Sequence, residues 1–394
     1  MTDLIVAIVL TLLVQAMISA TVVAPAVLAP VAQGDIGIAA SWIGVFTSLI
    51  YATATLSAPL GGTMVARQGA VRVSQYCLLF AGTGFALCAL AHPFVLVAGA
   101  LLIGCGYGPI TPASSEILAA RTPPRIRNLV MSIRQSGVPV GGALAGVLVP
   151  LLLMALDWQA TVLVIAASCF FLAILLQAVR EQYDSARHDA PQRPRPSLMA
   201  LMRMVFTHAE LRHAALTSFA YGGIQWCLAS FVVVFLTERG ALSLSNAGFA
   251  LSAAMTGGIV GRVLWAAVAD YIGNARIVLG TLGIVMSLSA FVMSQVSPDW
   301  PLAAIFVLCT VFGASAIGWN GVYIAEIARI MPVDKVALAT GASLAVTYLG
   351  VVVTPFLFWL LLTVTGSYAV AFIVVGILTF IASLAYFRRV SWQA

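Results

Sequence analysis

Twelve apolar stretches, each long enough to cross a bilayer, fill most of this 394-residue chain, and only 8% of its residues carry charge. A helix that crosses about 30 Å of hydrocarbon needs about 20 residues, because each residue adds about 1.5 Å. Inside lipid every backbone N–H and C=O group must be satisfied within its own segment, so such stretches can only be helices. The sequence therefore predicts an all-α integral membrane protein with twelve transmembrane helices. The expected spans are residues 4–30, 41–66, 75–92, 94–119, 128–155, 158–179, 211–236, 245–269, 275–296, 300–325, 338–364 and 367–387.

Basic residues gather on alternate connections between these spans. One side holds sixteen Lys and Arg residues, and the other side holds only Arg239. Because cytoplasmic loops are enriched in Lys and Arg, the basic side is predicted to be cytoplasmic, with both termini on that side. This asymmetry accounts for the net charge of +6. It also disfavours a nucleic-acid-binding surface, since the arginines lie on short connections. The first span lacks a basic segment before it and is longer than a signal peptide, so we expect it to be retained.

The chain reads as two related halves. We predict a six-helix bundle over residues 1–179, a cytoplasmic linker over 180–210 and a second six-helix bundle over 211–394. The connection after span two is echoed after span eight, with Gly69 matching Gly273 and Arg72 matching Arg276 at one offset of 204 residues. Duplicated halves are typical of transporters. They suggest two pseudo-symmetric bundles that rock about a central cavity.

Over nearly its full length the chain resembles the major facilitator superfamily. The C-terminal copy of the connection fits that family's loop pattern G-x-L-x-D-R-x-G-x-x-R, with Tyr271 in place of its second charged residue. The N-terminal copy has Ala66 where the family has an acid. The resemblance implies a bacterial inner-membrane carrier, usually monomeric, with a cytoplasmic clasp between its halves. The residues that it implies for this gate are Arg67, Gly69, Arg72, Asp270, Gly273 and Arg276.

Ionised groups within spans are the best pointers to function, because charge in hydrocarbon is costly and normally faces a cavity or a partner. Arg134 lies two turns into span five, followed by Gln135, and Glu116 lies near the end of span four. The tight connection between these spans places the two charges at similar depths. One interpretation is a static ion pair. The other is an arginine whose guanidinium meets an anionic substrate, with Glu116 as its counter-charge in the empty state.

Arg262 is the second arginine within a span, two turns before Asp270. A glycine–arginine pair here resembles the position used for carboxylate recognition by monocarboxylate- and oxalate-type members of the family. A contact between Arg262 and Asp270 at the cytoplasmic gate explains the residue equally well, so both interpretations stay open.

Span ten carries a polar stripe in which Asn320, Tyr323 and Glu326 follow one another at three-residue intervals on one helix face. Such a stripe either lines a cavity or forms hydrogen bonds between helices. Weaker candidates for substrate contact come from five spans. They are Gln15, Tyr107, Thr111, Tyr221, Gln225, Trp226, Trp319 and Tyr348. Aromatic and amide groups around one or two arginines suit a small organic anion, particularly a carboxylate. Glycines before Pro109 in span four, and further glycines in span five, allow close helix approach and local unwinding.

We therefore expect a secondary transporter that moves a small organic anion by alternating access. Proton-linked symport is favoured only by family analogy, with Glu116 or Glu326 as coupling residues, and uniport stays open. The alternatives are an efflux or exchange carrier for a neutral or amphipathic solute, and a transporter-like membrane sensor. The sequence carries no signature of a membrane enzyme such as HExxH or GxSxG, and its six cysteines show no paired spacing. No metal, cofactor or nucleic-acid partner is predicted; the expected partners are the substrate, the bilayer and protons.

Overall fold

The computed structural model describes residues 2–123, 126–184, 198–332 and 335–387. These residues form seventeen α-helices and no strand. Part of the predicted linker, residues 185–197, lies outside the described residues, as do the basic residues that the sequence places at 388 and 389. Eleven helical segments are long and apolar enough to cross a bilayer, and a shorter apolar helix, Tyr368–Leu384, makes the twelfth span. The predicted all-α membrane fold is therefore confirmed.

The chain divides into two compact units. Unit 1 comprises Met1–Pro191 and Leu242–Ser252, and unit 2 comprises Gln192–Ala241 and Ala253–Ala394. Unit 1 contains α1 (Thr2–Ile36), α2 (Ile43–Gln68), α3 (Ala70–Leu87), α4 (Pro93–Tyr107), α5 (Ile110–Ala119), α6 (Arg127–Gln135), α7 (Gly137–Leu152), α8 (Trp158–Leu175) and α9 (Arg180–Asp184). Unit 2 contains α10 (Leu198–Thr207), α11 (Ala209–Glu238), α13 (Ala275–Met293), α14 (Leu302–Ala316), α15 (Asn320–Ile330), α16 (Val336–Thr365) and α17 (Tyr368–Leu384). Helix α12 (Leu244–Ile272) begins in unit 1 and continues in unit 2.

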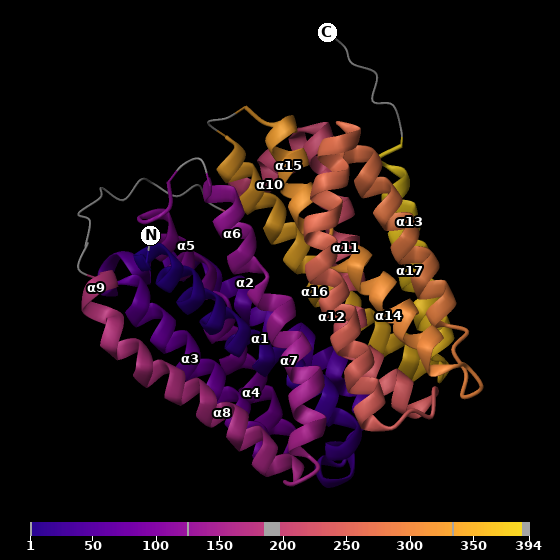
Figure 1. Cartoon of the computed structure of the whole chain (residues 1–394). Coiled ribbons are helices and arrows are strands. Elements are labelled where there is room, and N and C mark those ends of the chain that lie inside the picture. Colours follow the sequence, from indigo (N-terminus) through magenta and orange to yellow (C-terminus); the bar gives the residue numbers. More distant parts are fainter. Residues whose placement is uncertain (1, 124–125, 185–197, 333–334, 388–394) are drawn as a thin grey trace. The chain divides into compact units, whose positions relative to one another are not determined.

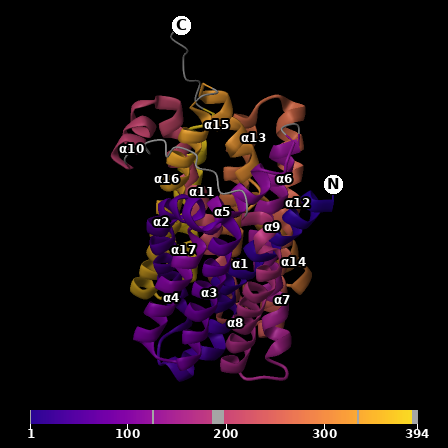
Figure 2. The ribbon, with the colours of Figure 1, turned by 90° about the vertical axis from the view of Figure 1, so that its left-hand side faces the viewer.

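Within unit 1, α1 packs along α7, and α3 packs against both α4 and α8 (Figure 1). Within unit 2, α11 packs along α16 and α13 along α17 (Figure 1). The short α10 lies beside α16 (Figure 2). Small residues permit the closest of these approaches. A Cβ added at Gly141 of α7 would lie 2.1 Å from the backbone oxygen of Ala16, and one at Gly350 of α16 would lie 2.0 Å from that of Phe219. Packing between backbones holds helices together where lipid removes the hydrophobic drive.

Three of the spans are interrupted. Span four breaks at 108–109 between α4 and α5, span five breaks at Ser136 between α6 and α7, and span ten breaks at 317–319 between α14 and α15. Pro109 lacks a backbone N–H, which explains the first break. Gly108 and Pro109 both keep right-handed helical dihedrals, so the backbone does not unwind before Pro109. The sequence signalled no break in span ten. Interrupted helices in transporters commonly mark the binding region, because their freed backbone groups line a cavity.

Candidate functional site

Arg134 occupies the last turn of α6, directly before the break in span five. Its side chain is only 3% exposed, and its Nη1 donates a hydrogen bond to Ser114 Oγ in α5, just after the break in span four. Ser114 in turn donates to the backbone oxygen of Ile110. A guanidinium stays protonated in proteins, so unit 1 holds a buried positive charge between two interrupted spans.

Glu116 does not join this arrangement. It lies two residues after Ser114 on α5, but its side chain is exposed and forms no ion pair within the described ranges. The structure therefore places Ser114 beside Arg134, where the sequence suggested Glu116. Arg134 is not held by the static ion pair with Glu116 that was one of the two interpretations of this arginine.

The other unit 1 candidates are spread over four helices. The hydroxyl oxygen of Tyr107 accepts a hydrogen bond from the hydroxyl group of Tyr51 at 3.1 Å. Gln15 of α1 is buried. It lies where α7 begins, because a Cβ added at Gly137 would lie 2.8 Å from the Cβ of Gln15. Gln135 is half-buried beside Arg134, and Thr111 is exposed. Of these, Gln15 and Gln135 lie nearest to the α6–α7 break that carries Arg134.

In unit 2, Arg262 of α12 is half-buried and donates from Nε to the backbone oxygen of Ile317 at 3.3 Å. Ile317 is the first residue of the break in span ten, so this arginine contacts an interrupted helix, as Arg134 does in unit 1. Trp265, one turn further along α12, donates to Ala314 O at 2.9 Å. Asp270 is exposed and forms no ion pair among the described residues, so the suggested contact between Arg262 and Asp270 is not formed.

Aromatic and amide side chains gather at the same break. Gln225 of α11 accepts from both Trp319 Nε1 at 3.2 Å and Asn320 Nδ2 at 3.4 Å. The ring of Trp319 packs edge-on against Tyr221 and Tyr323. The two tyrosine hydroxyls are committed within unit 2, that of Tyr221 to the backbone oxygen of Leu279 and that of Tyr323 to Ser343. Trp226 is buried on α11, and Tyr348 is half-buried on α16.

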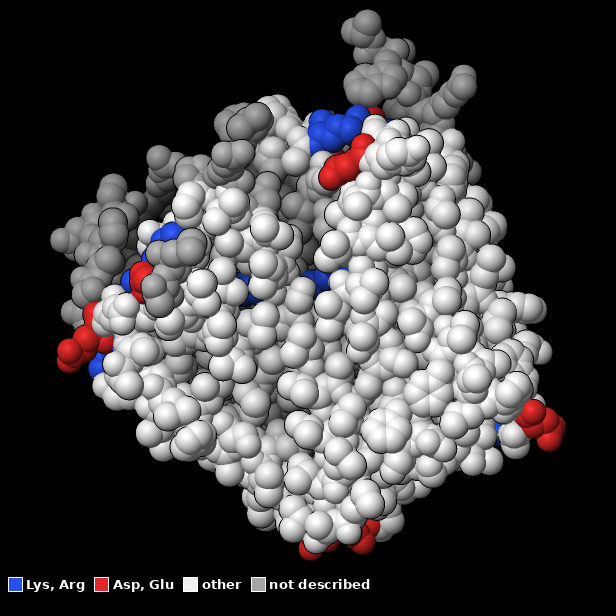
Figure 3. Space-filling model, in the orientation of Figure 1, with Lys and Arg blue, Asp and Glu red and all other residues white. Residues whose placement is uncertain are grey.

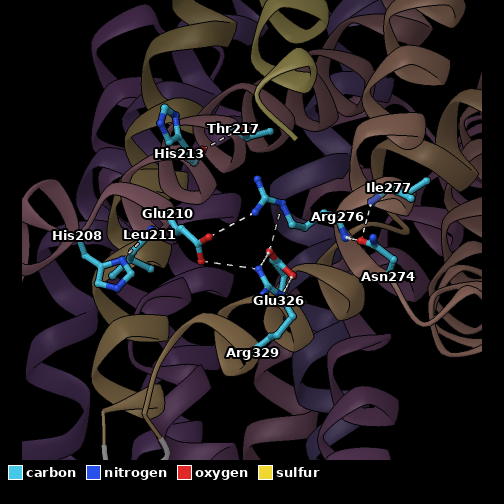
Figure 4. Close-up of polar contacts among 10 residues, drawn as sticks. All are labelled: His208, Glu210, Leu211, His213, Thr217, Asn274, Arg276, Ile277, Glu326 and Arg329. Carbon is cyan, nitrogen blue, oxygen red and sulfur yellow. Dashed lines mark hydrogen bonds and ion pairs between the residues drawn. The ribbon is translucent and has the colours of Figure 1, made fainter. Parts of the chain in front are cut away.

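Four charged residues form a separate cluster in unit 2, and we call it the charge cluster (Figure 4). Glu326 is 1% exposed and accepts two 2.8 Å hydrogen bonds from Arg329. Glu210 pairs with Arg276 at 3.4 Å and with Arg329 at 3.7 Å, and Arg276 lies 4.0 Å from Glu326. The sequence predicted Glu326 and Arg276 as functional residues, but in different roles. It did not single out Glu210, although an acid in the first turn of a helix is a recognisable signal.

The remaining gate candidates lie at the end of α2 and at the starts of α3 and α13. Gly69 and Gly273 both have positive φ, at +92° and +68°. Helix α13 is capped locally, since Asn274 accepts from the backbone N–H groups of Arg276 and Ile277. Arg67 is exposed, and Arg72 donates from Nη1 to Gln75 Oε1 at 3.2 Å.

Helix α3 has a different cap, supplied by the end of the first half. Asp184 accepts from Val71 N at 2.8 Å and from Arg72 N at 3.1 Å, and it lies 3.7 Å from Arg180. An acid therefore stands at the N-terminal loop although Ala66 occupies the position where the family has one. No pattern in the sequence indicated the role of Asp184.

Comparisons with known proteins agree with this architecture. The sequence profile of the Major Facilitator Superfamily matches residues 9–326 and 243–391. The hexuronate transporter of Bacillus subtilis is 23% identical over 381 residues, which cover 92% of this chain and 89% of that protein. A probable sulfoacetate transporter of Cupriavidus necator is 24% identical over 393 residues, covering 91% and 87%. The gentisate transporter of Corynebacterium glutamicum is 26% identical over 314 residues, covering 76% and 68%.

Solved structures show the same fold at lower identity. A bacterial homologue of the human lysosomal transporter Spinster, in an inward-facing and unoccupied conformation, gives a TM-score of 0.75 at 15% identity and covers 98% of this chain and 96% of that one. A nucleoside transporter gives a TM-score of 0.78 at 14% identity, with 96% and 99% covered. The chain belongs to the major facilitator superfamily, and it is a multi-pass membrane transporter rather than an enzyme.

Proposed function

We propose that this transporter carries a small organic anion, preferably a carboxylate, across the bacterial inner membrane. The observation that carries the proposal is Arg134, a permanent cation that is 3% exposed at the junction of two interrupted spans. A buried charge within a span is expensive unless it serves a site or a partner. A guanidinium presents a planar fork of donors that matches a carboxylate in two parallel hydrogen bonds.

The relatives support the same chemistry. Three of the similar transporters are named for hexuronate, sulfoacetate and gentisate, and each of these solutes is an organic anion. The three differ in their carbon skeletons, so the feature that they share is the acidic group. We therefore assign the acidic group of the substrate to the buried arginine and leave the recognition of its skeleton to other residues.

Unit 2 contains a second set of groups that suits an organic acid. Arg262 and the Gln225–Trp319–Asn320 arrangement meet at the break in span ten. The carboxamide oxygen of Gln225 is occupied by two donors, which orients its NH2 group as a fixed donor. Aromatic faces beside fixed amides suit a compact, partly polar organic acid better than an inorganic ion.

We further propose that transport proceeds by alternating access with both termini cytoplasmic, in a monomer, and that protons accompany the anion. Glu326 is the coupling candidate that the geometry supports better, because it is buried among arginines whereas Glu116 is exposed. A proton arriving at Glu326 would weaken its two hydrogen bonds to Arg329 and so loosen the charge cluster.

The test is uptake of radiolabelled gentisate, galacturonate and sulfoacetate into proteoliposomes that contain the full chain. Arg134→Gln should reduce uptake of the accepted anion at least about 30-fold, the equivalent of about 2 kcal/mol for a lost buried charge contact. Arg134→Lys keeps the positive charge but not the planar fork of donors. Its uptake should therefore lie between that of the wild type and that of Arg134→Gln. Arg121→Gln is the matched control, because Arg121 pairs with Asp3 away from the breaks.

Each variant should elute as a monodisperse peak before its uptake is compared. If Arg134→Gln takes up the anion at the wild-type rate, Arg134 does not bind the anion. Equal losses in Arg134→Gln and Arg121→Gln would also count against it, since they would show a general effect of removing an arginine from unit 1.

A further inference from the structure

Unit 1 contains a cavity of about 330 Å³ that the proposed transport route does not use. It lies where α1 ends, α2 and α4 begin and α8 begins, and its walls come from these helices and from α3. The lining is almost wholly apolar and includes Ala29, Phe46, Phe85 and Val162. A water molecule takes about 30 Å³ of liquid and a methylene group is of similar size, so the cavity has room for about ten methylene groups.

The mouth of the cavity lies among exposed apolar residues. Phe94, which forms part of the lining, is 81% exposed, and Leu90 beside it is 65% exposed. Trp42 and Trp158 also line the cavity at the ends of their spans, where indole rings settle at the headgroup level. A cavity so placed in a membrane protein meets acyl chains before any other solute.

Polar side chains in the lining are already committed to the protein. Gln33 donates from Nε2 to Pro30 O at 3.1 Å and accepts from Ala40 N at 3.3 Å. The indole N–H of Trp158 donates to Asp35 at 2.6 Å. Burying a polar group without a hydrogen bond is costly, so the interior favours a hydrocarbon chain over a polar solute.

The rim has a negative charge. Asp35 is exposed at the end of α1 and also accepts from Gln159 at 3.4 Å, while Asp157 caps α8 by accepting from Ala160 N. The adjoining connections, residues 35–41, 91–93 and 153–159, contain no Lys or Arg. Where α7 ends and α8 begins, the face shown in Figure 3 carries acidic side chains. Such a rim attracts an ammonium group and repels a phospholipid with net negative charge.

We propose that this cavity is a binding site for a phospholipid with an ethanolamine headgroup. About ten methylene groups of one acyl chain occupy the cavity, and the ammonium group lies at Asp35. The site is independent of the anion pathway, because every residue that lines it belongs to the far ends of the unit 1 spans from Arg134.

The test is native mass spectrometry of the full chain, delipidated in detergent and titrated with dioleoyl phosphatidylethanolamine or dioleoyl phosphatidylglycerol. The wild-type chain should retain one phosphatidylethanolamine at lipid concentrations where phosphatidylglycerol dissociates. Ala29→Phe fills the cavity and should lower occupancy at least about fivefold. Ala167→Phe places the same ring on the exposed face of α8, outside the lining, and should bind as the wild type does. Asp35→Asn should keep one lipid but lose the preference between headgroups.

Unchanged occupancy in Ala29→Phe would overturn the cavity as the site. Equal retention of the two lipids by the wild-type chain would overturn the role of Asp35. If Ala29→Phe does not fold, the proposal is tested by the quenching of tryptophan fluorescence by brominated phosphatidylethanolamine. Trp158→Phe should then remove a larger share of the quenched fluorescence than Trp300→Phe, and equal shares would overturn the proposal.

Discussion

The starts of α3 and α13 occupy matching positions in the two halves, yet they are stabilised in different ways. Each follows a glycine with positive φ, Gly69 or Gly273. Helix α13 is capped by its own Asn274, whereas α3 is capped by Asp184, more than a hundred residues further along the chain. The duplicated loop has thus kept its backbone turn while its polar contacts have diverged.

The divergence also changes what the matching arginines do. In unit 2 the Arg276 side chain joins Glu210 and Glu326 in the charge cluster. In unit 1 the Arg72 side chain donates to Gln75 and lies 5.9 Å from the centre of the Tyr76 ring. The unit 2 loop therefore contributes to a network of opposite charges. The unit 1 loop leads into a helix whose start is capped by Asp184, which is distant in the sequence. We expect a switch at the unit 2 loop and a static brace at the unit 1 loop.

The largest expected difference between the loops comes from their glycines. Gly69 has φ +92° and ψ 156°, a region that essentially only glycine adopts, and an added Cβ would lie 2.3 Å from the Asp184 carboxyl carbon. Gly273 has φ +68°, and a Cβ there would meet nothing within 4 Å. Gly69→Ala should lower the free energy of unfolding by about 3 kcal/mol, and Gly273→Ala by about 1 kcal/mol. Unfolding of the purified variants in mixed micelles measures both. Equal losses would mean that the Asp184 contact does not distinguish the loops.

The next largest difference concerns the two span-end glutamates that the sequence treats as equivalents. Glu326→Gln removes a buried partner from two arginines and should cost about 2–3 kcal/mol of unfolding free energy. This is below the 3–5 kcal/mol typical of a fully buried pair, because the Arg329 side chain is 41% exposed. Glu116→Gln should cost less than about 0.5 kcal/mol, since Glu116 is exposed. The same micelle assay compares the two variants, and a loss in Glu116→Gln that matches Glu326→Gln would contradict the asymmetry.

These pairs show which features could be read from the sequence. Span length and hydropathy predicted every membrane crossing, because the bilayer imposes those properties on each segment separately. The turn glycines Gly69 and Gly273 could be read from a repeated motif, and Asn274 could be read as a local cap. Features that depend on one segment alone were therefore accessible.

Features that depend on two segments were not accessible. Asp184 caps a helix that lies far from it in the sequence, so no local pattern marks its role. Glu210 could be recognised as an acid in the first turn of α11, but its pairing with the distant Arg276 could not. The prediction that Glu116 pairs with Arg134 was wrong for a related reason. Counting residues from a turn estimates depth, but two residues apart on a helix point about 200° apart, so Ser114 faces the arginine and Glu116 does not. The depth of a residue in the membrane can be counted along its own helix. Which side chains of that helix face another residue depends on how the neighbouring helix packs against it.

The smallest expected effect concerns the two caps themselves. Asp184→Ala should cost about 2 kcal/mol of unfolding free energy, at the upper end for a cap, because the lost acceptor is charged and its side chain is only 8% exposed. Asn274→Ala should cost about 1 kcal/mol, since water can reach the exposed start of α13. Asp184→Asn keeps a neutral acceptor and should recover about half of the loss. Thermal unfolding of the three variants in one detergent provides the ranking. If Asn274→Ala proved the more destabilising change, the unit 1 loop would not depend on its distant cap, and the brace assigned to Asp184 would have to be given up.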